Sequence, residues 1–195
     1  LFTRARYVDA LEHFELCAQA DPRLRAVVYE SIENLKSIIV DRWHFSMLND
    51  TVRNSCYENS IVRAVEAFRH RHEGRGPVVL DIGGGTGLLS MFAARAGAES
   101  VYCCELSPSL CNIAGRCVQG NGYGGRITVV AKHSRDVIVG IDMASKADII
   151  VTELMDAGLF GEHIIPTLND ARERLLTVGG VVIPHNATVF GVFVE

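Results

Sequence analysis

A glycine-rich turn between an apolar run and an amphipathic segment constrains the fold of this chain more than any other feature. Residues 78–105 read VVLDIGGGTGLLSMFAARAGAESVYCCE. The run 78–82 is apolar and rich in β-branched residues, which predicts a buried strand. Glycines then permit a tight turn and the close approach of a ligand. Helical periodicity follows over 88–96 and a second short strand over 100–104. This order predicts the nucleotide-binding half of a doubly wound α/β fold.

Glu105 ends the second strand, and its position predicts a ligand contact. The carboxyl ends of parallel strands share one edge of the sheet, so Glu105 should lie beside the turn and accept hydrogen bonds from two ribose hydroxyls. Gly83, Gly85 and Gly87 form GxGxG, not the GxGxxG of dinucleotide loops. Asp81 would repel a pyrophosphate and suits a ligand with an ammonium group. The pattern favours S-adenosylmethionine. The alternatives are a nicotinamide cofactor and a turn that binds nothing.

Length and charge bound the class of protein. The chain has 195 residues, is 48% hydrophobic and 22% charged, and carries a formal net charge of −4. These values indicate one globular domain with a small annex. The negative charge argues against an electrostatic nucleic-acid binder and is compatible with a basic protein substrate. No apolar run reaches transmembrane length, and no signal peptide is recognisable. Because the chain begins without Met, we expect it to be part of a longer protein.

The cysteines show no metal-ligand spacing. None of the six forms a CxxC motif, and no histidine stands at a ligand spacing from them, so we expect no metal site. We interpret them as reduced thiols packed as small hydrophobic groups in a cytosolic or nuclear protein.

The first 40 residues are expected to be helical. Four positions follow the spacing of the second half of a tetratricopeptide repeat: Ala10, Phe14, Cys17 and Pro22. A generic amphipathic helix that ends at the Asp21-Pro22 pair fits equally well. A second helix over 24–39 could cap a repeat array or lead into the next domain.

Further along, the periodicity predicts several more elements. A helical stretch over 43–57 has a break near Asn49, where Asp50 or Thr51 could cap the next helix, 52–68. The later elements are a helix over 107–119, strands over 126–130 and 147–152, a helix over 166–176, a strand in VVIP, and a strand over 188–194. Their order predicts a parallel sheet with right-handed crossovers.

Two glutamates bracket a glycine-containing loop after the strand over 147–152. Glu153 and Glu162 lie on a loop that leaves the carboxyl end of this strand, at the sheet edge where the cofactor is expected. Neighbouring carboxylates repel unless a cation lies between them. A guanidinium, with five donors in a planar fork, suits that role. The alternative is that Glu162 faces solvent and Glu153 pairs with a neighbouring Arg, and spacing alone does not decide.

Three segments in order resemble the protein arginine N-methyltransferases. They are the HxxMLxDxxR pattern in HFSMLNDTVR, the run VVLDIGGGTGLLSMFAARAGA, and the double-glutamate loop ELMDAGLFGE. The resemblance extends from about Trp43 to the end of the chain. RWHFSMLNDT and MDAGLFGE look most like a subtype that carries tetratricopeptide repeats upstream. KHSRDVIVG and VIPHNATV also resemble a second subtype.

The resemblance implies a Rossmann-like class I S-adenosylmethionine methyltransferase domain over 41–183. Residues 1–40 could be the end of a tetratricopeptide array, and 184–195 would be the first strand of a truncated β-barrel domain. The implied reaction transfers methyl groups from S-adenosylmethionine to arginine nitrogens of protein substrates, giving S-adenosylhomocysteine and mono- and symmetric dimethylarginine. We expect the chain to bind the cofactor but to lack the barrel that completes the substrate groove.

The resemblance also implies partners and a location. Arginine-containing proteins, RNA-processing proteins among them, would be substrates, and other proteins could bind the N-terminal helices. Direct nucleic-acid or membrane binding is not expected. The location would be the cytoplasm, the nucleus or both.

For the amino-acid part of the cofactor, the resemblance implies five contacts. Arg53 would bind the methionine carboxylate. His44 and Met47 would lie over the cofactor, Met47 near the methyl sulfonium. Asp81 and the turn 83–87 would surround the remaining amino-acid atoms.

For the rest of the site, the resemblance implies that Glu105 binds the ribose and that the Ser134 backbone contacts the adenine. Glu153 and Glu162 would grip the target guanidinium. Three departures from the family pattern lie nearby: Arg135 replaces an acid that contacts the adenine amine, Met-Asp-Ala at 155–157 replaces the Met-Gly-Tyr of asymmetric dimethylating members, and His163 replaces a small residue. A nicotinamide oxidoreductase and a non-catalytic interaction module remain as alternative functions.

Overall fold

The computed structural model describes residues 2–39, 43–156 and 158–192. By their contacts these residues form two compact units, Leu1–Arg53 and Asn54–Glu195. The first unit has one buried cluster, and the second unit has two. The predicted division of the chain at 40/41 and at 183/184 refers to functional domains and stays a prediction.

The first unit consists of helices, the first two of which are joined by a capped 3-10 turn. Helix α1 spans Phe2–Ala20, the 3-10 helix η1 Pro22–Leu24, α2 Arg25–Ile39 and α3 Trp43–Asn49. Asp21 caps η1 by accepting the Arg23 N–H at 3.0 Å. The buried cluster contains Ala18, Val28 and Ile32, with Leu11 and Phe14 packed against it. Cys17, which the repeat pattern placed at a small-residue position, is exposed, and its neighbour Ala18 is buried instead.

Helix α4, Thr51–Arg71, begins where the sequence predicts a cap. The Arg53 N–H donates to Asp50 Oδ1 at 2.9 Å. This bond satisfies one of the donors that the first turn of a helix leaves without an intrahelical partner. Of the two predicted candidates, Asp50 is therefore the cap and Thr51 is the first helical residue.

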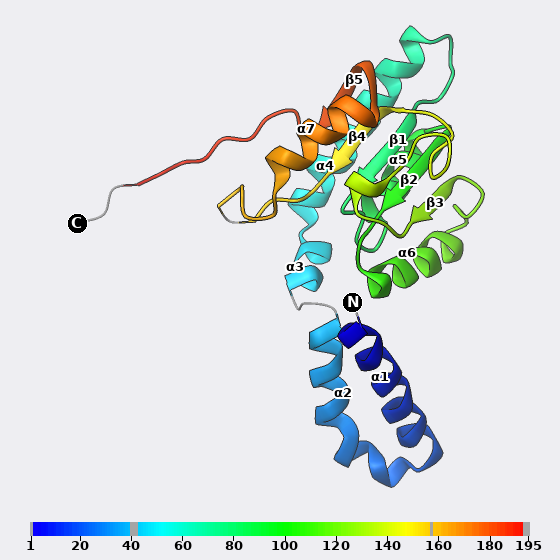
Figure 1. Ribbon diagram of the computed structural model, residues 1–195, viewed down its shortest axis with the longest axis vertical. Coiled ribbons are helices and arrows are strands. Elements are labelled where there is room, and N and C mark those ends of the chain that lie inside the picture. Colours follow the sequence, from blue (N-terminus) through cyan, green and yellow to red (C-terminus); the bar gives the residue numbers. More distant parts are fainter. Residues whose placement is uncertain (1, 40–42, 157, 193–195) are drawn as a thin grey trace. The chain divides into compact units, whose positions relative to one another are not determined.

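The second unit is built on a five-stranded sheet (Figure 1). Its strands are β1 (Val78–Ile82), β2 (Ser100–Cys104), β3 (Ile127–Val130), β4 (Ala147–Thr152) and β5 (Leu176–Ile183). They pair in the order β3-β2-β1-β4-β5, and every pair is parallel. The chain therefore reverses its winding between β1 and β4, which is the place where open α/β sheets bind ligands.

Helices cover both faces of this sheet. Buried residues of α4, α5 (Leu88–Ala96) and α6 (Pro108–Gly120) form one cluster with the sheet. Helix α7 (Ile164–Arg174) and the segment after the 3-10 helix η2 (Ser134–Asp136) form a second cluster on the opposite face. All five residues of β1 are buried, as expected for a central strand covered on both sides. The predicted Rossmann-like α/β class is confirmed.

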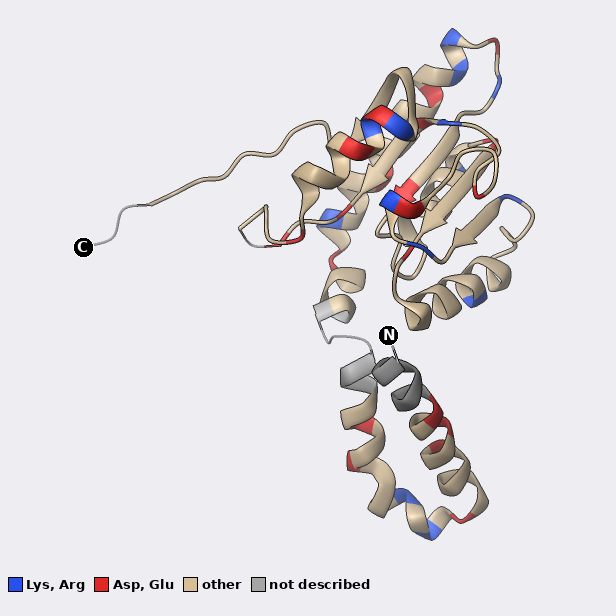
Figure 2. Ribbon diagram, viewed as in Figure 1, with Lys and Arg blue, Asp and Glu red and all other residues tan. Residues whose placement is uncertain are grey.

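Three predicted elements differ from the structure. The strand predicted in VVIP is the end of the longer β5, which begins at Leu176. Helix α7 begins at Ile164 and ends at Arg174, so that Leu176 opens β5 instead of closing the helix. Residues 188–192 form no strand, and 193–195 lie outside the described residues. Lys and Arg are interspersed with Asp and Glu on helices and loops of the second unit (Figure 2). Within the described ranges, no helix has the length and apolar character needed to span a membrane.

Candidate cofactor-binding site

The turn after β1 is fixed by backbone hydrogen bonds. The N–H groups of Gly83 and Gly84 both donate to the Cys104 carbonyl, at 2.9 and 3.0 Å, and the Gly87 N–H donates to the Gly84 carbonyl at 2.7 Å. Gly83, Gly85 and Gly87 have φ angles of 76°, 55° and 83°. Side chains make this left-handed conformation costly, so the turn requires glycine at these three positions.

Gly84 is required for a different reason. Its φ is not positive, but a Cβ atom there would collide with the Cys103 Sγ and lie 3.5 Å from Asp81 Oδ2. The turn therefore rests directly on the side chains at the carboxyl ends of β1 and β2. The sequence shows four glycines here, but only tertiary contacts distinguish the role of Gly84 from that of its neighbours.

Glu105 lies beside this turn, as its sequence position predicts. The side chain is buried. Its Oε2 accepts the Gly85 N–H at 2.9 Å and its Oε1 accepts the Ser107 N–H at 2.7 Å. A carboxylate can accept about four hydrogen bonds, so each oxygen retains capacity for a further donor. The two hydroxyls of a ribose are donors of that kind.

Asp81 is a buried acid with one oxygen left over. Its Oδ2 accepts the Ser90 hydroxyl at 2.7 Å, whereas the buried Oδ1 has no hydrogen-bond partner among the described residues. Burial raises the pKa of Asp81 to about 6; hydrogen bonds from Ser90 oppose this rise, and the charge of Glu105 adds to it. An oxygen in this state suits an ammonium group of a ligand, which would supply both a donor and the opposite charge.

The cysteines at the same edge are neutral thiols. Burial, with the nearby charge of Asp81, strongly raises the pKa of the Cys103 thiol. Burial raises the pKa of Cys104 to about 12, and its S–H donates to the Lys132 carbonyl at 3.2 Å. All six cysteines are free, and Cys17 and Cys56 are exposed rather than packed in a core. No group of three metal-ligating side chains occurs in the described parts of the chain.

Ser134 is held in place by α7. The Arg174 Nη2 donates to the Ser134 carbonyl at 3.1 Å, and Nη1 donates to the Val137 carbonyl at 2.9 Å. The same guanidinium binds both oxygens of Asp170, at 2.8 and 2.6 Å. Ser134 is buried, whereas the neighbouring Arg135 is exposed. The exposed side chain of Arg135 is the departure from the family acid at this position.

The double-glutamate loop connects β4 to α7. Glu153 follows the last residue of β4, Glu162 lies shortly before α7, and both are half-buried. Between them, Asp156 accepts the Leu159 N–H on its carbonyl at 2.9 Å and the Gly161 N–H on Oδ1 at 3.2 Å. Asp156 therefore orders the loop. A joint grip on one guanidinium by Glu153 and Glu162 stays a prediction, and residue 157 lies outside the described residues.

The other predicted cofactor contacts belong to the first unit. His44 and Met47 lie on α3, and Arg53 lies in the first turn of α4. The Arg53 Nη2 donates to the Met47 carbonyl at 3.3 Å, which links the two helices at this point. The structure brings together Arg53 and Met47, and the contact of all three residues with the cofactor stays a prediction.

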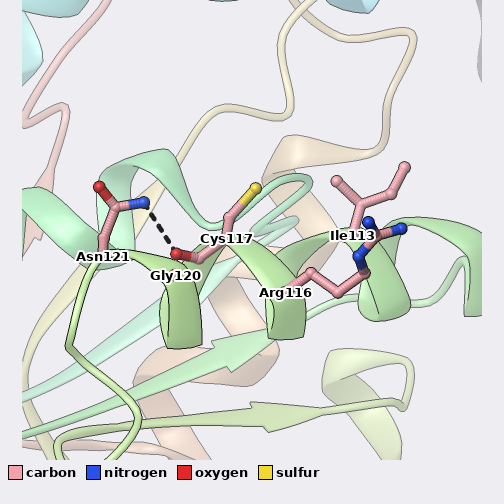
Figure 3. Close-up of a pocket in the computed structure, with 5 residues that line it drawn as sticks. All are labelled: Ile113, Arg116, Cys117, Gly120 and Asn121. Atoms are coloured by element: carbon pink, nitrogen blue, oxygen red, sulfur yellow. Dashed lines mark hydrogen bonds between the residues drawn. The ribbon is translucent and has the colours of Figure 1, made fainter.

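A separate hollow lies on α6 (Figure 3). It is lined by Ile113, Arg116, Cys117, Gly120 and Asn121. The Asn121 side-chain amide donates to the Cys117 carbonyl at 2.8 Å and closes its own helix end. None of the predicted site residues lines this hollow, and we assign the ligand site to the glycine turn.

The sheet order, the glycine turn after β1 and the acid after β2 together define a class I methyltransferase fold. A family model described as ribosomal protein L11 methyltransferase (PrmA) matches residues 60–184. This match covers more than half of the chain, and the chain therefore belongs to that methyltransferase family.

Curated relatives narrow the similarity to arginine methyltransferases. The arginine N(omega)-methyltransferase of Streptomyces achromogenes subsp. streptozoticus is 41% identical over 152 residues, 78% of this chain and 40% of that protein. Protein arginine N-methyltransferase 9 of Xenopus laevis is 39% identical over 197 residues, covering 96% of this chain and 23% of that protein. Protein arginine N-methyltransferase 7 of Gallus gallus is 45% identical over 151 residues, covering 76% of this chain and 22% of that protein.

These relatives confirm the predicted resemblance, which favours protein arginine N-methyltransferase 9, with protein arginine N-methyltransferase 7 as runner-up. The chain spans 40% or less of the length of each of the three relatives.

Solved structures support the same fold. The Trypanosoma brucei PRMT1 enzyme–prozyme heterotetrameric complex with AdoHcy has a TM-score of 0.66 at 32% identity, covering 76% of this chain and 43% of that chain. Arabidopsis thaliana protein arginine methyltransferase 10 has a TM-score of 0.63 at 29% identity, covering 75% of this chain and 39% of that chain.

Proposed function

We propose that this chain binds S-adenosylmethionine and belongs to an enzyme that methylates arginine side chains of protein substrates. The observation that carries the proposal is the pair of buried acids around the glycine turn. Glu105 is fixed by two backbone donors, and Asp81 has a buried oxygen without a partner. The names of the relatives supply the arginine part of the proposal.

Asp81 also argues against a nicotinamide dinucleotide, whereas an acid in the position of Glu105 could bind the ribose of either cofactor. A pyrophosphate normally lies at the glycine turn and the helix N-terminus that follows it. Here Asp81 lies under that turn, close to Gly84. The two phosphate charges of a pyrophosphate would be repelled by the Asp81 carboxylate, whereas the ammonium group of an amino acid would neutralise that carboxylate. The site therefore favours the cofactor with an amino-acid end.

The residues of the chain would position the reacting groups. When bound, S-adenosylmethionine supplies a methyl group that its sulfonium has already activated for transfer. Glu153 and Glu162 would bind the guanidinium of the target arginine, hold its charge on the bound nitrogens, and orient the third nitrogen for attack. Arg53 would bind the methionine carboxylate, and His44 and Met47 would lie over the cofactor, Met47 near the methyl sulfonium. The Ser134 backbone would contact the adenine.

Several finer features complete the proposal. The Met155-Asp156 pair departs from asymmetric dimethylating members, which supports mono- and symmetric dimethylation. The substrates would include RNA-processing proteins, and the N-terminal helices would belong to a tetratricopeptide array that binds protein partners. The enzyme would act in the cytoplasm, the nucleus or both, without binding nucleic acid or membranes directly.

Calorimetric titration of the chain with S-adenosylhomocysteine and with NAD tests the cofactor assignment. We expect binding of S-adenosylhomocysteine and none of NAD. Binding of NAD in its place would establish the oxidoreductase alternative, and binding of neither compound would refute the cofactor site. If the cofactor binds but arginine-rich peptides are never methylated by the complete protein, the non-catalytic interaction module is the better description.

A further inference from the structure

A second buried residue, Ser90, controls how Asp81 is presented. Ser90 lies in the first turn of α5 and is fully buried. Its hydroxyl donates to Asp81 Oδ2 at 2.7 Å. The other oxygen of Asp81, Oδ1, is buried without a partner. Ser90, through its hydroxyl and its backbone, therefore supports the carboxylate, while Oδ1 has no partner among the described residues.

We infer that Ser90 is a positioning residue of the cofactor site, which holds Oδ2 of Asp81 so that Oδ1 is kept for a cationic group of the ligand. This inference rests on the proposed function, because the cationic group would be the ammonium of S-adenosylmethionine or S-adenosylhomocysteine. It goes beyond that function by assigning a role to a residue on α5 that would act through Asp81.

The surroundings of Asp81 explain why one hydroxyl has a large effect. Ser90 faces it from α5, and Cys103 faces it from β2 as a neutral thiol. Glu105, after β2, adds a negative charge, and among the described residues none of the groups that shift the pKa of Asp81 is a cation. A buried carboxylate without a counter-charge is unfavourable. The Ser90 hydroxyl is therefore a main support of the ionised form until a cation arrives.

This arrangement links cofactor binding to a proton. Below the pKa of Asp81, which burial raises to about 6, an arriving ammonium must displace the proton from the carboxyl group. The affinity should therefore fall by about tenfold for each pH unit below that value. Removing the Ser90 hydroxyl deletes one hydrogen bond to a charged group, which should move the midpoint upward by about one to two pH units.

The experiment measures the affinity for S-adenosylhomocysteine by calorimetry from about pH 5 to about pH 8. The variants are Ser90→Ala, Asp81→Asn and Ser60→Ala. Ser60 lies on the exposed side of α4, and its hydroxyl donates to a carbonyl of its own helix, that of Cys56, at 2.8 Å. Ser60→Ala therefore removes the same group at a neutral position. Asp81→Asn cannot titrate, so any pH dependence of binding that survives in this variant belongs to other groups.

The inference requires an upward shift of the midpoint in Ser90→Ala, no shift in Ser60→Ala, and loss of this transition in Asp81→Asn. The carboxyl titration of Asp81 in the ligand-free protein, followed by isotope-edited infrared spectroscopy, should show the same shift without any cofactor. An unshifted midpoint in Ser90→Ala would overturn the inference even though the parent binds the cofactor normally. A parent that fails to bind S-adenosylhomocysteine at any pH would instead refute the proposed function.

If Ser90→Ala does not fold, Ser90→Cys keeps nearly the same volume with a weaker donor. An intermediate upward shift is then expected, and an unshifted midpoint in a folded Ser90→Cys protein would equally overturn the inference.

Discussion

Replacement of Glu105 by alanine tests the assigned centre of the cofactor site. In the structure, each carboxylate oxygen accepts one backbone N–H, from Gly85 and from Ser107. The capacity that remains is one further bond on each oxygen, enough for two ribose hydroxyls. Loss of two charge-assisted bonds of about 1.5 kcal/mol each should weaken binding by about 3 kcal/mol, or about a hundredfold in Kd.

The same substitution should also lower stability. Without the carboxylate, the N–H groups of Gly85 and Ser107 lose their acceptor, which should reduce the free energy of unfolding by about 1–3 kcal/mol. Affinity for S-adenosylhomocysteine should therefore be measured by calorimetry at a temperature where urea titration shows that Glu105→Ala is fully folded. This condition separates the loss of a ligand contact from partial unfolding.

Glu99 provides a matched control next to the opposite end of β2. It directly precedes β2 at the opposite end and forms an exposed ion pair with Arg75, with Nη1 and Oε2 3.6 Å apart. Such pairs contribute about 0–1 kcal/mol, so Glu99→Ala should bind the ligand like the parent. Equal affinities for Glu105→Ala and the parent would refute the ribose assignment. A hundredfold loss in Glu99→Ala would show that the effect is not specific to the site.

Three further predictions concern the turn, the substrate loop and the buried acid. Gly84→Ala should lower the free energy of unfolding by about 1–3 kcal/mol through overpacking. In urea titrations, the double variant with Cys103→Ala should recover most of that loss, because the clash partner is removed. Purely additive effects in the double variant would contradict the clash. In the complete protein, Glu153→Gln and Glu162→Gln should each lower methyl incorporation at saturating cofactor by about a hundredfold or more, and their combined effect should be less than additive. If Glu162→Gln has almost no effect, only Glu153 binds the guanidinium. The raised pKa of Asp81, about 6 against an ordinary value of 3.8, gives stability that is fully present below the unfolded pKa and lost as pH rises through about 6. Lowering the pH from 7 to 5 should therefore raise the free energy of unfolding of the parent by about 1 kcal/mol more than that of Asp81→Asn, and identical pH slopes in urea titrations would show that the carboxyl is not buried.

The sheet was predictable because its strands are short apolar runs bounded by breakers. The strands 78–82, 100–104 and 147–152 have the predicted limits, since Gly or a polar residue interrupts each run at its carboxyl end. The alternating pattern over 188–194 failed as a predictor within 188–192, because alternation forms a strand only where a neighbouring strand accepts its backbone hydrogen bonds. The burial of Ala18 in place of the predicted Cys17 also depends on packing in three dimensions.

In the candidate site, too, some features were predictable from the sequence and others depended on contacts between elements. Glu105 was predictable because a residue after a parallel strand has only one edge of the sheet to occupy. The clash that requires Gly84 and the bond from Ser90 to Asp81 were not predictable, because they join atoms of separate elements. A buried serine in a helical pattern looks like any small core residue until its partner is known.

Transfer of an isotopically labelled methyl group from S-adenosylmethionine to an arginine-rich peptide tests the central claim most directly. The complete protein should be incubated with the peptide, and the peptide then hydrolysed and its amino acids separated. We predict label in monomethylarginine and symmetric dimethylarginine, and its loss with Glu105→Ala at a cofactor concentration well below the Kd of that variant. Label in another amino acid, or no transfer by a protein that binds the cofactor, would contradict the assignment as a protein arginine methyltransferase.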